Sequence, residues 1–311
     1  MADSRARRNI GKMTAWRDTI KLKFKRVVLC FFQIHDIRRM KNPLYIMMTP
    51  LIFGMMTIPF GQLNKQSYHI TAERGDTSLL KIPTSGAVLT LSGLNFNLYN
   101  SQPKKFKGIF AKPPYKMMQV KYPASIAKNS ISKGVEMLDE AIKSTPGQKI
   151  ILAHSQGAQV CSRWMREHAN DPAAPAPKDL IFILSGNPLR HSAGYIIGRK
   201  EVGGTTGLET PINTPWRIID VARRYDGWAD WVQDEENEPA VKNAEKGKNT
   251  LHLKYDEVDL FDTSHSIWVK GNTTFVLTRE KELPLAKGKR LSAAEYDEMR
   301  AKIEAAYTNR P

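Results

Sequence analysis

Residues 149–168 connect a short apolar strand to a helix through a single serine, and this feature constrains the fold more than any other. The strand reads KIILAH (149–154), which has the length and composition of a buried strand, and QGAQVCSRWMREHA (156–169) follows as a helix. Between them lies Ser155, in the sequence A-H-S-Q-G. A strand that leads directly into a helix is the repeating unit of a parallel sheet with helices on its faces.

The same alternation continues on both sides of this unit. The segment 126–143 has apolar residues at steps of three and four, which predicts an amphipathic helix. Further strands are expected at 87–92 (AVLTLS), 179–188 (DLIFILSGNP), 216–226 (WRIIDVARRYD) and 272–278 (NTTFVLT), and a polar helix at 292–307. The order predicts an α/β fold with a central, mostly parallel sheet covered by helices.

The turn makes Ser155 the candidate nucleophile. A serine at a sharp strand-to-helix turn holds its hydroxyl clear of neighbouring side chains, and the helix N-terminus favours developing negative charge. The usual pattern is G-x-S-x-G, and Ala153 occupies the first small position here. The alternative is an ordinary serine that caps the helix. A nucleophilic role therefore requires a base and an acid elsewhere in the chain.

In α/β-hydrolases the nucleophile precedes the acid, and the acid precedes the histidine. Of the seven histidines, only His252 and His265 follow the candidate acids. These acids are Asp226, at the carboxyl end of the expected strand 216–226, and Asp230, four residues further on. We favour Asp226 and His252, and keep Asp230 and His265 as alternates.

Acyl transfer also needs backbone N–H groups that stabilise an oxyanion. The expected donors are the N–H of Gln156, directly after the serine, and that of Leu94, in the loop after the expected strand 87–92. Gly93 in this loop permits a close approach of the backbone. The sequence has no metal-ligand spacing and no glycine-rich phosphate loop, so we expect no metal and no cofactor.

The N-terminal 61 residues have a different composition. Residues 1–43 carry twelve Lys and Arg against three Asp, in a chain of net charge +16, but they lack patterns for base readout, so no specific nucleic-acid partner is expected. Residues 44–61 are uncharged and just long enough for a transmembrane helix, although Pro50, Gly54 and Pro59 weaken it. We expect a membrane anchor, with the following domain on the cell-envelope side. The alternative is a segment buried against the protein.

Several sequence blocks, in order along residues 88–285, resemble the PE-PPE domain, the cutinase-like serine hydrolase domain of mycobacteria and their relatives. They are VKYPAS (120–125), IILAHSQGAQV (150–160), GNPLR (186–190), RYDGWADW (224–231), LHLKY (251–255) and NTTFVLTREKELPL (272–285). The resemblance implies a cutinase-like α/β-hydrolase fold with Ser155 as nucleophile, Asp226 as acid and His252 as base. It also implies esterase activity on fatty acyl esters, and some membrane-anchored relatives act as acyltransferases in cell-envelope lipid assembly.

The expected organisation is therefore a basic arm (1–43), an apolar anchor (44–61), an α/β-hydrolase domain (66–290) and a C-terminal helix (291–311). The expected function is that of a serine esterase or lipase whose partner is an acyl ester or lipid, with association to a membrane. The first alternative is an acyltransferase. The second is a catalytically silent protein, either membrane-tethered or a phage-encoded structural component that binds glycolipid, because fold alone does not prove activity.

Overall fold

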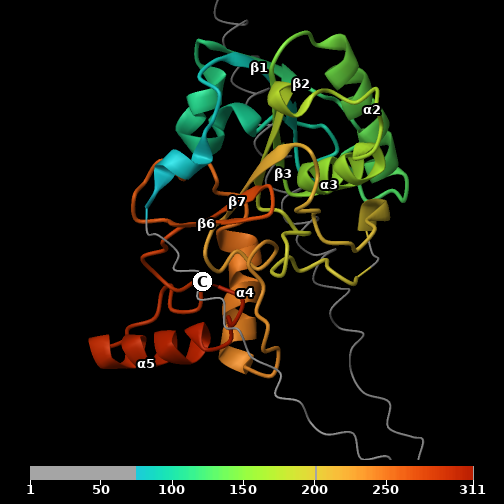
Figure 1. The fold of residues 1–311 in the computed structure, drawn as a ribbon. Coiled ribbons are helices and arrows are strands. Elements are labelled where there is room, and N and C mark those ends of the chain that lie inside the picture. The colour runs from blue at the N-terminus through green and yellow to red at the C-terminus, as the bar shows by residue number, and fades with distance from the viewer. Residues whose placement is uncertain (1–74, 200–201, 311) are drawn as a thin grey trace, which may run out of the picture. The chain divides into compact units, whose positions relative to one another are not determined.

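The computed structural model of the chain describes residues 75–199 and 202–310, which contain a seven-stranded sheet (Figure 1). The strand order is β2-β1-β3-β4-β5-β7-β6, and only β6 runs antiparallel to its neighbour. The strands are β1 (Gly86–Leu91), β2 (Tyr115–Gln119), β3 (Lys149–His154), β4 (Leu180–Ser185), β5 (Arg217–Ala222), β6 (Ser266–Lys270) and β7 (Thr273–Leu277). This topology confirms the predicted α/β-hydrolase class with a mostly parallel sheet.

Both faces of the sheet are covered, which explains why β3 and β4 are buried at every position. On one face, Ile151 and Ala153 of β3 pack with the helices α2 (Ser130–Ser144) and α3 (Gln156–His168), which lie side by side in Figure 1. On the other face, Ile150 and Leu152 pack against η3 (Gln102–Ala111) and residues of the 255–260 segment. Alternate residues of one strand thus enter two separate cores.

Two further helices complete the described unit. They are α4 (Glu238–Thr250), which begins with a cap from Asn237, and α5 (Ala293–Glu304), which begins with a capping box formed by Ser292 and Glu295. They pack around a third apolar cluster that includes Trp231, Ile303 and Tyr307. The single-turn 3₁₀ segments are η2 (Thr77–Leu80), η4 (Pro177–Asp179) and η5 (Val202–Gly204).

The prediction of a transmembrane helix is wrong for the part of the chain that the structure describes. None of its helices combines the length and the apolar composition needed to cross a bilayer. The longest, α2, has fifteen residues, and it buries only one apolar face, because charged residues occupy the other. Residues 44–61, on which that prediction rested, lie outside the described residues, as does the basic arm.

Candidate functional site

Ser155 occupies a strained turn between β3 and α3. Its backbone has φ 56° and ψ −118°, a region that residues other than glycine rarely adopt. Although Ser155 stands at the N-cap position of α3, its side chain makes no capping hydrogen bond. The hydroxyl instead lies 2.9 Å from Nε2 of His252. The geometry therefore does not fit the alternative in which Ser155 only caps the helix.

Small residues make this turn possible. A Cβ atom on Gly93 would lie 2.8 Å from Cβ of Ser155, and one on Gly157 would lie 2.6 Å from the carbonyl oxygen of Leu91. Both positions therefore need glycine. Ala153, which replaces the usual glycine of the motif, is fully buried. Its methyl group packs in the apolar core formed with α2 and α3.

His252 joins the serine to Asp226. It follows the end of α4, and Asp226 lies in the loop after β5, so two separate elements bring the residues together. The Nδ1 atom of His252 lies 3.0 and 3.1 Å from the two carboxylate oxygens of Asp226. Because an ionised carboxylate can only accept, Nδ1 carries the hydrogen, and Nε2 accepts from the hydroxyl of Ser155. The three side chains form one hydrogen-bonded chain.

The carboxylate of Asp226 is fully buried and has two further donors. The Tyr255 hydroxyl donates to Oδ2 at 2.8 Å, and the N–H of Trp228 donates to Oδ1 at 3.1 Å. Burial, with a further contribution from the Asp226 charge, raises the pKa of Tyr255 well above its usual value, so its hydroxyl stays protonated. The Tyr255 oxygen in turn accepts from the N–H of Arg223 at 2.9 Å. The orientation of Asp226 is therefore fixed from several sides.

The structure places the alternates Asp230 and His265 in other contacts. The carboxylate of Asp230 accepts from the N–H of Tyr225 at 2.7 Å and forms an ion pair with Arg310 from the C-terminal tail. His265, just before β6, donates from Nε2 to the carbonyl oxygen of Asp259 at 2.7 Å. Neither side chain takes part in the hydrogen-bonded chain of Ser155.

We expect Arg310→Met to lower the free energy of unfolding by roughly 3 kcal/mol, because it leaves the carboxylate of Asp230 buried without its cation. Urea denaturation measures the change. The control is Lys143→Met, which breaks the exposed ion pair with Asp139 and should leave the transition midpoint unchanged. Equal midpoints for wild type and Arg310→Met would contradict the prediction.

The predicted oxyanion donors lie beside the serine. Gln156 is the first residue of α3, where N–H groups have no partner within the helix, and Leu94 follows Gly93. No acceptor among the described residues is recorded for either backbone N–H. The side chain of Gln156 is held away from them, since it donates to the carbonyl of Ser125 at 2.8 Å and accepts from Ser130 at 3.2 Å. The oxyanion role of the two N–H groups stays a prediction.

Sequence reasoning missed His154, whose ring lies 4.8 Å from that of His252. Burial, helped by the nearby cation of Lys105, lowers the pKa of His154 well below its usual value, so the ring is neutral and donates from Nδ1 to the carbonyl of Ser185 at 3.0 Å. A Cβ atom on Gly186 would lie 2.9 Å from both histidine rings. His154 and Gly186 thus form a wall beside the candidate base. The only sequence signal was the position of His154 next to the serine.

Lys105 was also missed, since one lysine of a K-K-F-K run gives no signal of burial. Its side chain is 3% exposed, and Nζ lies 5.5 Å from the centre of the Tyr255 ring. Burial lowers the pKa of Lys105 to about 8, although the charges of Asp256 and Asp226 act in the opposite direction. A cation therefore lies within electrostatic reach of the Asp226 carboxylate at neutral pH.

We expect Lys105→Met to be more stable than the wild type at pH 7, by about 3 kcal/mol, and to lose this advantage as the pH approaches 10.5. Between pH 8 and 10.5 the unfolded wild type binds more protons at this lysine than the folded protein does, so wild-type stability rises with pH. Chemical denaturation at both pH values tests this. The matched control is Lys104→Met, at an exposed neighbour. A stability difference that does not change with pH would contradict the prediction.

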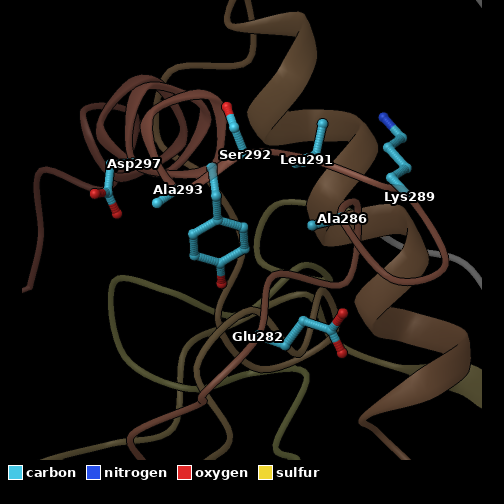
Figure 2. A pocket seen from close by; sticks show the side chains of 8 residues that line it. Glu282, Ala286, Lys289, Leu291, Ser292, Ala293 and Asp297 are labelled. Carbon is cyan, nitrogen blue, oxygen red and sulfur yellow. The ribbon is translucent and has the colours of Figure 1, made fainter.

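A cavity of about 330 Å³ lies away from these residues, between the 282–291 segment and the first turns of α5 (Figure 2). It is lined by Glu282, Ala286, Lys289, Leu291, Ser292, Ala293, Tyr296 and Asp297. Its lining includes no member of the hydrogen-bonded chain. Within residues 75–199 and 202–310, no group of three His, Cys, Asp or Glu side chains could hold a metal ion.

The comparisons with known proteins found a matching family and individual relatives. The family model of the PE-PPE domain matches residues 105–307. The chain is 30% identical over 178 residues to the esterase PE16 of Mycobacterium tuberculosis, covering 52% of this chain and 34% of that protein. It is 45% identical over 108 residues to the SL1278 acyltransferase Chp1 of the same organism, covering 33% of this chain and 26% of that protein. The chain thus spans about a third or less of the length of these two relatives.

A solved structure, the cutinase-like protein from Cryptococcus sp., is similar at 16% identity and a TM-score of 0.35, covering 57% of this chain and 95% of that one. The family match is the stronger finding, because it extends over more than half of the chain and includes Ser155, Asp226 and His252. The resemblance predicted from the sequence blocks is confirmed. The chain belongs to the PE-PPE domain family.

Proposed function

We propose that the protein is a serine enzyme that cleaves acyl esters through an acyl-enzyme. The observation that carries the proposal is the hydrogen-bonded chain from Ser155 through His252 to Asp226, built on a strained turn at the serine. Such strain persists where the surrounding structure enforces it, and it clusters at functional sites. The relatives named as an esterase and as an acyltransferase support the same class of chemistry.

In the proposed reaction, Nε2 of His252 takes the proton from the Ser155 hydroxyl while Oγ attacks the ester carbonyl carbon. Asp226 keeps its charge and stabilises the imidazolium that forms. The N–H groups of Gln156 and Leu94 stabilise the oxyanion of the tetrahedral intermediate. The intermediate collapses as the C–O bond breaks, and His252 returns the proton to the leaving alcohol. The acyl group remains on Ser155 as an ester.

The second half of the reaction distinguishes a hydrolase from an acyltransferase. Water or an acceptor alcohol gives its proton to His252 as its oxygen attacks the acyl carbon of the acyl-enzyme. The bond between this carbon and Oγ of Ser155 then breaks, His252 returns the proton to Oγ, and an acid or a new ester leaves. We propose acyl esters as the substrates, because one relative is named as an esterase and another as an acyltransferase. The acyltransferase alternative draws on the relative named as one.

The test combines a fluorophosphonate probe with a chain-length series of p-nitrophenyl esters. The full chain should be labelled on Ser155 and should release p-nitrophenol. An excess of a primary alcohol during turnover tests acyl transfer, because a new ester then appears in place of part of the free acid. The absence of both labelling and p-nitrophenol release, at every chain length, would contradict the proposed function. It would favour the catalytically silent alternative.

A further inference from the structure

The positive charge of the domain is concentrated in one part of its sequence. Residues 77–135 contain nine Lys and no Asp, Glu or Arg, whereas residues 136–311 contain 24 Lys and Arg against 26 Asp and Glu. The first of these segments forms β1, η3, β2 and the start of α2. The basic character of the described unit therefore comes from one end of the sheet, the end with the edge strand β2.

Three of these lysines follow β2 at the carboxyl end of the sheet. Lys121 is the second residue after the strand, Lys128 precedes α2, and Lys133 lies in the first turn of that helix. All three are exposed, and no ion pair with a described residue is recorded for any of them. Unpaired surface cations at one site create a positive potential that attracts anions.

Exposed apolar side chains come from the same segments. Leu98 and Tyr99, in the loop after β1, are 55% and 38% exposed, and Ile126, in the loop after β2, is 40% exposed. The two loops lie against each other, because the Asn97 side chain donates to the carbonyl of Tyr122 at 2.7 Å. We call Lys121, Lys128, Lys133, Leu98, Tyr99 and Ile126 the carboxyl-end surface.

This surface borders the candidate nucleophile. Gly93 lies near the start of the loop that carries Leu98, and a Cβ on it would lie 2.8 Å from Cβ of Ser155. On the other loop, the carbonyl of Ser125, next to Ile126, accepts from the Gln156 side chain at 2.8 Å. A partner on the carboxyl-end surface would therefore also lie beside Ser155.

We propose that the carboxyl-end surface docks the protein on an anionic lipid layer. Lysines beside exposed apolar side chains suit a layer with negative headgroups above apolar tails, since the cations stay with the headgroups while the apolar groups enter the boundary. A soluble polyanion would leave Leu98, Tyr99 and Ile126 in water. The inference goes beyond the proposed function, because docking requires no turnover.

The experiment uses the full chain with Ser155→Ala, so that binding is measured without turnover. Flotation with vesicles of phosphatidylcholine, alone or with one quarter phosphatidylglycerol, should show binding that depends on the anionic lipid. Hydrogen exchange on those vesicles should show protection of residues 94–99 and 120–128. The basic arm 1–43 can add to vesicle binding. Residues 94–99 and 120–128, however, are protected from exchange only where they contact the lipid layer themselves.

Matched variants separate this surface from total charge. Lys121→Glu with Lys128→Glu should weaken binding by roughly thirtyfold or more, whereas Lys178→Glu with Lys246→Glu, at exposed lysines elsewhere, should weaken it much less for the same change of net charge. Leu98→Asn should weaken binding more than Val269→Asn, at an exposed residue of β6.

Two results would overturn the proposal. In the first, the two double lysine variants weaken vesicle binding equally and residues 94–99 and 120–128 are not protected from exchange. This result would assign the binding to the basic arm 1–43. The other is protection of the same residues by polyphosphate or duplex DNA with no effect of Leu98→Asn, which assigns the surface to a soluble polyanion. A wild type that binds the vesicles but has no esterase activity would refute the proposed function and still support docking through the carboxyl-end surface.

Discussion

Replacement of Ser155 by alanine is expected to lower kcat/KM for p-nitrophenyl esters by roughly 10⁴-fold or more and to abolish fluorophosphonate labelling. The hydroxyl is the only group in the hydrogen-bonded chain that can form the acyl-enzyme, because His252 and Asp226 act through it. The variant should fold normally, since the Ser155 side chain makes no capping bond in α3. Initial rates and gel fluorescence of the labelled protein measure the two effects.

The matched control is Ser132→Ala, which removes a hydroxyl bonded only to the nearby carbonyl of Asn129. We expect its activity to stay within a factor of about two, because this contact is exposed and stays within one turn of its own helix. Labelling of Ser155→Ala at the wild-type level would assign the nucleophile to another residue. Loss of activity in both variants would indicate a folding defect instead.

The centre of the fold could be predicted because its elements carry strong local signals. The run KIILAH is buried at every position of β3, and the apolar stripe of Ile131, Val135, Leu138 and Ile142 is the buried face of α2. Both signals come from burial on the sheet and on its helix layer. Elements that bury less apolar surface give weaker signals, and they were the ones that the sequence did not reveal.

The helix α4 is the clearest missed element. Its buried residues are Ala240, Asn243, Ala244, Gly247 and Lys248, which are small or polar and form no apolar stripe. Small residues are required there, because a Cβ on Gly227 would meet the backbone of Ala244, and one on Gly247 would meet that of Tyr225. The helix packs backbone to backbone on the loop that carries Asp226. The edge strands β2 and β6 were missed because nearly all of their residues are partly buried or exposed.

The sequence predicted which residue types the candidate site needs, but chain order alone could not decide between alternative residues. It left two candidate acids, Asp226 and Asp230, and two candidate histidines, His252 and His265. In the structure, Asp230 is bound by Arg310, which lies 80 residues further along the chain, and His252 is set against Asp226 by the packing of α4. These are tertiary contacts with no local signature. The same holds for Lys105, which is buried against Tyr255 from a distant segment.

The choice of acid leads to the second large effect. Asp226→Asn is expected to lower kcat by roughly 10³- to 10⁴-fold. An asparagine amide can donate to Nδ1 of His252, which then carries its hydrogen on Nε2 and can no longer accept the Ser155 proton. The variant also loses the charge that stabilises the imidazolium. Single-turnover release of p-nitrophenol measures the acylation step directly.

Asp230→Asn is the matched comparison, four residues away, with a carboxylate that is also buried. It should lower stability, because Arg310 loses its charged partner, but it should keep kcat within about tenfold, since its contacts run to Tyr225 and the C-terminal tail. Both variants must therefore be assayed well below their unfolding midpoints. A larger loss of kcat in Asp230→Asn than in Asp226→Asn would move the acid to Asp230. Equal losses with normal stability would instead mean that the loop acts as one unit, in which Asp230 positions Tyr225 and, through it, Asp226.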